Sequence, residues 1–171
     1  MTTIAITGHR PEKISDRDWL IETLSHVFIL AGADKVIQGC ASGTDLISAF
    51  VAKNMGIPYV AAKPWENHKG RMGGSSGFTN DDAIVYDKMI ESASEVVNVT
   101  GKTDYPGSWA YFARNEWMVD EAMKDEGIVV AVWDGTKSGT RHCVEYALKN
   151  NCRVFRLDPL KNRIVGWIEE V

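Results

Sequence analysis

The sequence has few cysteines and no long apolar run, and each absence argues against a class of protein. Its three cysteines, Cys40, Cys143 and Cys152, form no Cys-x-x-Cys pair, which argues against a disulfide framework and against a cysteine-bound zinc. No apolar run is long enough to span a membrane, and the N-terminus lacks the basic and apolar segments of a signal peptide. We therefore expect a cytoplasmic protein that makes no contact with a membrane.

An excess of basic residues is also missing. The chain has 19 lysines and arginines against 23 aspartates and glutamates, a net charge of −4, which disfavours a nucleic-acid partner bound by charge alone. Its 171 residues, with 44% hydrophobic and 25% charged content, are ordinary for a globular protein with a proper core. We expect one domain over residues 1–171.

Several familiar motifs are absent as well. There is no Gly-x-Gly-x-x-Gly fingerprint and no Gly-x-Ser-x-Gly elbow. The stretch "VTGKT" resembles the end of a P-loop, but the required glycine five residues before Gly101 is Val96. His26 and His68 lack metal-ligand spacing. We predict neither a metal nor a cofactor.

The chain alternates short β-rich runs with amphipathic stretches. Strands are expected at 3–7, 35–38, 58–62, 95–99, 128–133 and 153–157, and the tail 158–171 could be a helix or an edge strand. Helices are expected after a capping box at Ser15 and Asp18, before Gly56, and at 80–93, 110–124 and 140–150. This pattern predicts an α/β fold: a Rossmann-like, doubly wound, mostly parallel sheet of about six or seven strands with helices on both faces. Two longer loops, 65–79 and 100–109, have no assigned role.

Glycine-containing loops follow three of the expected strands. They are "GHRP" after the first, "QGCASGTD" after the second and "WDGTKSGT" after the fifth. Ligands of open parallel sheets bind beyond the carboxyl ends of the strands, and glycine at a helix start lets backbone amides approach an anion. The loops therefore predict a ligand pocket that contains a phosphate site, with the candidate ligand-binding residues Gly8, His9, Arg10, Gly39, Ala41, Gly43, Asp45, Asp134, Gly135, Gly139 and Thr140. In this set the backbone amides of the glycines and Thr140 would bind phosphate, and Asp45 would bond a sugar or base or brace the loops.

The fourth expected helix adds Arg114 and Asn115. Asn115 lies on an apolar stripe with Met118 and Val119, so its amide needs a hydrogen-bond partner. The alternative is a helix-to-loop bond for Asn115 and a surface position for Arg114. The preceding "YPGSWAYF" offers aromatic rings that could stack on a base or a sugar, or else lie in the core or an interface.

Structural alternatives exist for the loop residues too. The glycines could serve only tight turns, His9 could be a satisfied loop histidine, and Ser42 with Asp45 fits an ordinary capping box. Cys143 has apolar neighbours on a helix face and is expected to be a buried core thiol. The functional interpretation gains from the three loops falling at one predicted edge of the sheet.

The stretches "ITGHRP", "QGCASGTD", "ARNEWMVDEA" and "VAVWDGTKSGTRHCVEYA" together resemble the YpsA-like branch of the SLOG superfamily. That superfamily also includes the LOG phosphoribohydrolases and the DprA DNA-processing proteins. The resemblance runs from Thr3 to about Pro159. It implies a Rossmann-like fold, a nucleotide or ADP-ribose-like ligand at the strand carboxyl ends, and a homo-oligomer, by family resemblance a dimer.

The LOG pattern matches this chain only in part. Arg114 and Met118 match its arginine and methionine, but Cys143 stands where those enzymes have a glutamate, and Glu145 lies about 200° around the helix. We therefore expect a binding protein. The alternatives are an N-glycosidic-bond hydrolase, with Arg114, Asp45, Asp120 and Asp134 as candidate catalytic residues, and a DprA-like single-stranded DNA module.

Overall fold

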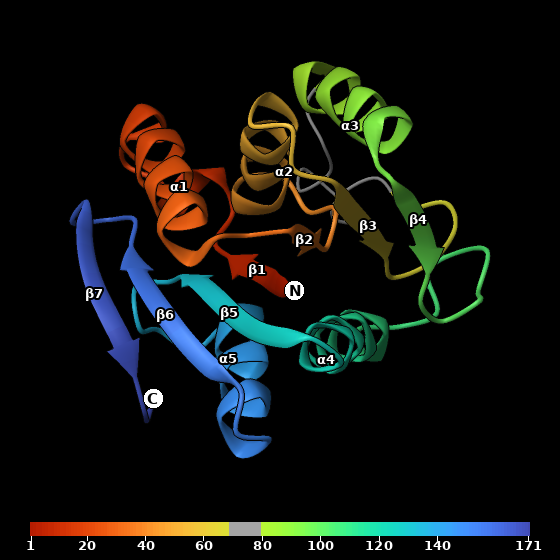
Figure 1. Cartoon of the computed structure of the whole chain (residues 1–171). Coiled ribbons are helices and arrows are strands. Elements are labelled where there is room, and N and C mark those ends of the chain that lie inside the picture. The colour runs from red at the N-terminus through yellow and green to blue at the C-terminus, as the bar shows by residue number, and fades with distance from the viewer. Residues whose placement is uncertain (69–79) are drawn as a thin grey trace.

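The computed structural model describes residues 1–68 and 80–171 and contains one seven-stranded sheet. The strand order is β4-β3-β2-β1-β5-β6-β7, and every neighbouring pair is parallel except β6 and β7 (Figure 1). The strands are β1 (Thr2–Gly8), β2 (Lys35–Gln38), β3 (Tyr59–Lys63), β4 (Glu95–Asn98), β5 (Glu126–Val132), β6 (Arg153–Asp158) and β7 (Arg163–Ile168). The predicted α/β class and mostly parallel sheet are confirmed.

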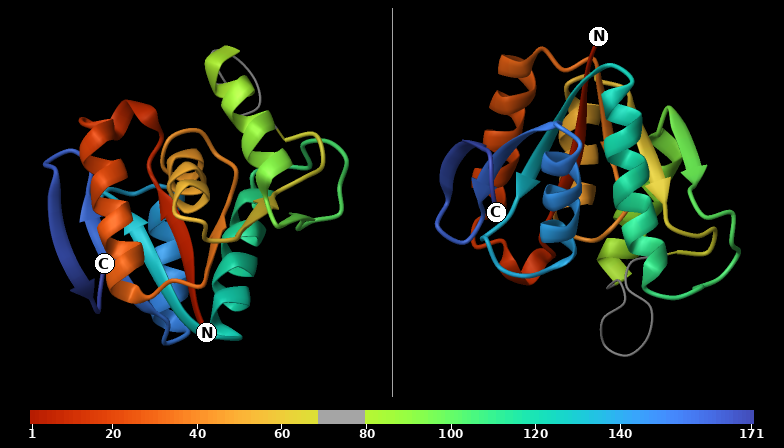
Figure 2. Two further views of the ribbon diagram at one scale, coloured as in Figure 1. Left: turned by 45° about the horizontal axis from the view of Figure 1, so that its top comes forward. Right: turned by 90° about the horizontal axis from the view of Figure 1, so that it is seen from below.

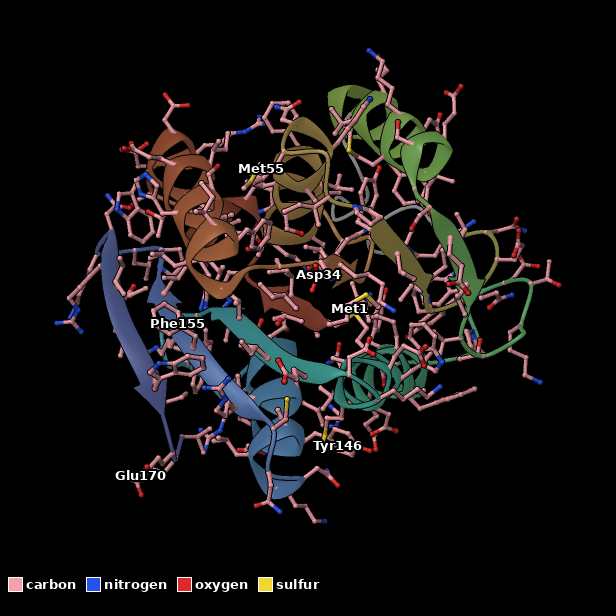
Figure 3. All side chains as sticks on the ribbon, in the orientation of Figure 1. Met1, Asp34, Met55, Tyr146, Phe155 and Glu170 are labelled. Carbon is pink, nitrogen blue, oxygen red and sulfur yellow. The ribbon has the colours of Figure 1, made fainter. Side chains whose placement is uncertain are left out.

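Helices cover both faces of the sheet, as predicted. They are α1 (Arg17–Ala31), α2 (Thr44–Asn54), α3 (Asn80–Ser92), α4 (Trp109–Met123) and α5 (Gly139–Lys149), with the short 3-10 helix η1 (Pro11–Lys13) after β1. The two views of Figure 2 show α1, α2 and α3 on one face and α4 and α5 on the other. Side chains fill the space between these layers (Figure 3).

Strand alternation explains why two cores form. Successive side chains of a strand point to opposite faces. Ile4 and Ile6 accordingly join the core under α1 and α2, whereas Ala5 joins the core under α4 and α5. All three are essentially inaccessible to solvent, so β1 is buried on both faces, as expected for a central parallel strand.

The sheet changes its winding direction between β1 and β5. The chain builds outward from β1 through β2, β3 and β4, and then returns through α4 to place β5 on the other side of β1. The register runs from Thr2 opposite Glu126 to Gly8 opposite Val132, so β1 and β5 end level. The loops that follow them therefore start side by side, at the position where open α/β sheets bind ligands.

One local expectation needs correction, and one open alternative is decided by the structure. Asp16, not Ser15, caps α1, because its side chain accepts the amide hydrogen of Trp19. The Ser15 hydroxyl instead lies 2.9 Å from the carbonyl of Pro159, a partner 144 positions away that no local pattern reveals. The ambiguous tail forms β7, an antiparallel edge strand.

The loop glycines at 70, 73, 74 and 77 lie outside the described residues. Among residues 1–68 and 80–171, no helix is long and apolar enough to cross a bilayer.

Candidate ligand-binding site

A pocket of about 380 Å³ opens at the carboxyl end of β1. Its walls come from the segment after β1, the loop before α2, the first turns of α4 and the start of α5. Nine of the predicted binding residues line it: Gly8, His9, Arg10, Ala41, Asp45, Arg114, Asn115, Gly139 and Thr140. Five predicted residues do not line it: Gly39, Gly43, Asp120, Asp134 and Gly135.

The N-terminus of α5 faces this pocket. Ser138 is its N-cap, and its hydroxyl accepts the amide hydrogen of Arg141 at 3.3 Å. The amides of Gly139 and Thr140 belong to the first turn, where helical N–H groups have no intrahelical acceptor. A side chain at Gly139 would meet no atom within 4 Å, so the backbone there is open to a ligand. This helix end is suited to an anion.

The loop before α2 differs in part from the phosphate cradle expected there, because three of its amides already have acceptors within the protein. The amide of Cys40 donates to the Gln38 side chain at 2.7 Å, and the amide of Ala41 donates to Asp45 at 3.1 Å. The amide of Thr44 donates to the carbonyl of His9 at 3.2 Å. These three amides are therefore occupied by acceptors of the protein itself.

The glycines of the first two loops allow close packing of the chain on itself. A side chain on Gly43, whose φ is +85°, would lie 2.8 Å from the carbonyl oxygen of His9. One on Gly8 would lie 2.5 Å from the side chain of Thr44. Glycine is therefore required at both positions by contacts within the protein.

Arg114 is buried, in contrast to the surface position that the structural alternative gave it. Only 8% of its surface is exposed, and its guanidinium donates to the carbonyl of Gly39 and, at 3.3 Å, to Asn115. A side chain on Gly39 would lie 2.8 Å from that of Arg114. The arginine thus fixes the β2 loop against α4 from within the pocket wall.

Asp45 is a buried carboxylate in the same wall. It is 5% exposed, and one of its oxygens accepts the amide hydrogen of Ala41. Burial raises the pKa of Asp45 above its ordinary value, although the neighbouring Arg114 charge and the hydrogen bond from Ala41 oppose that rise. The expected capping box with Ser42 is not formed, because Gly43 is the N-cap residue of α2 and provides no side-chain bond.

Asp134 connects the β1 and β5 loops just behind the pocket. Its carboxylate lies 2.8 Å from His9 Nε2 and 3.2 Å from Lys13 Nζ, and it accepts the amide hydrogen of Thr136 at 3.0 Å. Burial alone would raise the pKa of Asp134, but the hydrogen bonds from Thr136, His9 and Lys13 outweigh it and hold the pKa below its ordinary value. Burial lowers the pKa of His9, which favours the neutral ring.

Asn115 forms the helix-to-loop bond that was the structural alternative for it. Its Nδ2 donates to the carbonyl of Gly139 at 3.1 Å and so ties α4 to the start of α5. Because it also lines the pocket, Asn115 positions the α5 end at which an anion would bind.

Asp120 and Glu145 lie outside the pocket wall. Asp120 accepts a hydrogen bond from Tyr146 at 2.8 Å, and Glu145 pairs with Arg141 at 2.7 Å on the surface of α5. Cys143, at the position of the LOG glutamate, is fully buried as expected, and burial raises its pKa to about 12. The carboxylates of Asp120 and Glu145 therefore do not line the pocket, and the residue at the position of the LOG glutamate is a buried thiol.

Sequence reasoning missed several residues of the wall. Thr7, Glu12, Lys13, Ser108 and Ser138 all line the pocket. Lys13 is the most relevant to an anion, because its side chain is 40% exposed and bonds Thr136 at 2.9 Å. The local signal that could have indicated Lys13 is Pro11, because a proline is typical of the first position of a helix and here begins η1, the helix that contains Lys13. Within the described part of the chain, no three His, Cys, Asp or Glu side chains gather to hold a metal ion.

Comparison with known proteins supports the fold. No protein-family model matches the chain. The uncharacterized SPbeta prophage-derived protein YoqJ of Bacillus subtilis (strain 168) is 27% identical over 165 residues, which cover 87% of this chain and 91% of that protein.

Two solved structures share the architecture. DNA processing protein A from Helicobacter pylori, described for its single-stranded DNA binding mode, has a TM-score of 0.64 at 20% identity, over 98% of this chain and 69% of that one. The molybdenum cofactor binding protein from Rippkaea orientalis has a TM-score of 0.58, also at 20% identity, over 94% of this chain and 79% of that one. At such identities the likeness shows a Rossmann-like fold, and function must be argued from the site.

Proposed function

We propose that this chain is a SLOG-type protein that binds a nucleotide or a nucleotide-derived, ADP-ribose-like small molecule in the pocket at the end of β1. The observation that carries the proposal is the start of α5 facing that pocket at the β1/β5 switch point. Its open amides and the helix dipole would hold a phosphate. Arg10 and Lys13 in the same wall would supply positive charge.

Asp45 gives the pocket a second chemical character. A carboxylate oxygen accepts hydrogen bonds and repels phosphate, so Asp45 would take the hydroxyl or N–H groups of a sugar or base. A ligand with an anionic end and a donor-bearing end fits this wall better than inorganic phosphate does. The fold neighbour from Rippkaea orientalis is a molybdenum cofactor binding protein, which supports a small-molecule ligand for this fold.

The proposal is tested by thermal shift. A ligand at 100 times its Kd stabilises the native state by about 2.7 kcal/mol, roughly 5–11 °C for a chain of this size. AMP, ADP-ribose, NAD and cyclic nucleotides form the panel. Gly139→Asp would place a carboxylate in the anion site while suiting a helix N-terminus, and it should abolish the shift. Gly139→Ala is the matched control and should retain it. A panel that leaves the melting temperature of the wild-type chain unchanged would refute the proposal.

N-glycosidic-bond hydrolysis is the second candidate, favoured by one observation. Asp45 is a pocket carboxyl whose pKa is raised by burial, and such a group can act as a general acid. Against it, Cys143 occupies the LOG glutamate position and is buried. Incubation with AMP followed by chromatography decides: base release near the median enzyme rate of about 10 s⁻¹, lost in Asp45→Asn, would establish the hydrolase.

Single-stranded DNA remains a third candidate ligand. The net charge of −4 disfavours it, but the fold neighbour from Helicobacter pylori binds single-stranded DNA, so charge alone does not exclude it. Binding of an oligonucleotide whose affinity falls steeply with salt would favour this candidate. A homo-oligomer stays an expectation from the family resemblance.

A further inference from the structure

Two aromatic rings lie on the pocket wall between the starts of α4 and α5. Tyr111 and Phe112, in the first turn of α4, both line the pocket, and we call these two side chains the aromatic lip. Phe112 is 40% exposed. The other large apolar side chains of the α4 stripe, Met118 and Val119, are buried at 1% and 0%. The lip is therefore an apolar surface at the pocket that the core leaves uncovered.

Each ring of the lip packs against neighbouring side chains of the protein. The ring centroid of Phe112 lies 4.3 Å from that of His142 on α5, at an interplanar angle of 44°. Tyr111 packs edge-on against Trp65 at 5.3 Å, and the guanidinium of Arg114 lies 5.6 Å from its centroid. Trp65 is fully buried, so Tyr111 rests on a fixed support. Rings positioned in advance lose little side-chain entropy when a ligand packs against them.

The lip lies close to the anion site. Asn115, one turn after Tyr111 on α4, bonds the carbonyl of Gly139 at 3.1 Å. His142, the ring behind Phe112, is in the first turn of α5 and its amide donates to Ser138. A ligand whose phosphate binds at Gly139 and Thr140 therefore has an aromatic surface within its own length.

We propose that the aromatic lip binds the planar ring of the ligand, so that the site takes nucleotides in preference to sugar phosphates. The inference rests on the proposed function, because it assumes a phosphate at α5. Aromatic rings attract a flat heterocycle through offset stacking and burial of apolar area. A sugar phosphate offers no such face and would leave Phe112 exposed to water.

The test compares two probes on matched variants. Binding of AMP and of ribose 5-phosphate is measured by calorimetry for the wild type, Phe112→Ala, Phe112→Trp and Trp109→Ala. Trp109 is the control, since it belongs to the same turn of α4 and is 48% exposed but does not line the pocket. Loss of one base stack corresponds to a roughly 5- to 150-fold loss of affinity. Because Phe112 is partly exposed, its truncation should leave the fold intact.

We expect Phe112→Ala to weaken AMP by that factor and to leave ribose 5-phosphate unchanged, while Phe112→Trp retains AMP and Trp109→Ala changes neither. If Phe112→Ala changes neither probe, or weakens both equally, the lip does not bind the ring, although the phosphate site stands. If the wild type binds neither of these probes nor any other nucleotide of the thermal-shift panel, the phosphate site itself is refuted and this inference falls with it.

Discussion

Replacing Arg114 by alanine should destabilise the protein much more than removing a surface arginine. The guanidinium is the donor to the carbonyl of Gly39, and its charge lies beside the buried Asp45. Both partners stay buried after the substitution. An unpaired buried carbonyl costs about 1–3 kcal/mol, and deleting one partner of a buried charge interaction costs about 3–5 kcal/mol in total.

The expected loss of about 3–5 kcal/mol corresponds to a fall of roughly 6–20 °C in Tm for a chain of this size. Arg141→Ala is the matched control, because Arg141 pairs with Glu145 on the surface, where such a pair contributes about 0.3–0.5 kcal/mol. Arg114→Met retains the aliphatic stem and separates lost packing from lost polar contacts.

Urea titration of the three variants and the wild type provides the measurement. Arg114→Ala and Arg114→Met should both shift the midpoint far below that of Arg141→Ala. If Arg114→Ala costs no more than Arg141→Ala, the guanidinium does not support the β2 loop, and the account of this wall is wrong. If only Arg114→Met retains wild-type stability, packing rather than hydrogen bonding is the cause.

Three further predictions concern the same region. Asp45→Asn should cost less than Arg114→Ala at pH 7, because Arg114 keeps its acceptor at the carbonyl of Gly39, and because the raised folded pKa means that ionising Asp45 lowers stability as pH rises from the ordinary carboxyl pKa to the folded one; a loss of Tm as large as that of Arg114→Ala would contradict this. Gly43→Ala should cost at least about 2 kcal/mol, whereas Gly139→Ala should be neutral or stabilising by up to about 1 kcal/mol, as urea midpoints would show. Asp134, with its lowered pKa, contributes stability that is present above the ordinary carboxyl pKa and lost as pH falls toward the folded one. Acid titration of Asp134→Asn should therefore show a flatter decline than the wild type, and an identical curve would remove this role.

Most of the fold could be predicted from the sequence, because strand alternation and helical periodicity are local. Lys35–Gln38 was predicted with the same bounds as β2, and the other strands to within about two residues. The tail was ambiguous because "RIVGWI" is short and its pairing with β6 is set by a long-range ladder. The N-cap of α1 was misplaced for a similar reason, since the Ser15 hydroxyl is used by a distant carbonyl.

The sequence predicts where the candidate site lies better than it predicts what each residue of the site does. The loops do meet at one edge of the sheet, because parallel strands bring their carboxyl ends together. A glycine in such a loop, however, has the same local signal whether a ligand or another backbone approaches it. A side chain on Gly43 would meet the backbone of His9 and Arg10, whereas one on Gly139 would meet no atom within 4 Å, and only the tertiary packing of His9 against Gly43 reveals this difference. The burial of Arg114 is likewise a tertiary property.

The carbonyl oxygen of His9 accepts two hydrogen bonds from Thr44, and this pair of bonds has a consequence for the dynamics of the protein. Both the amide and the hydroxyl of Thr44 donate to that oxygen, at 3.2 and 2.9 Å, and the contact is buried. If the segment after β1 or the loop before α2 opened alone, both hydrogen bonds would break and the close contact between Gly43 and His9 would be exposed to solvent. The two segments, 35 positions apart in the chain, should therefore exchange their amide hydrogens with solvent as one cooperative unit, at the slow rate of the sheet's centre. The wall of the pocket on this side, between the β1 loop and the start of α2, is therefore rigid before any ligand binds.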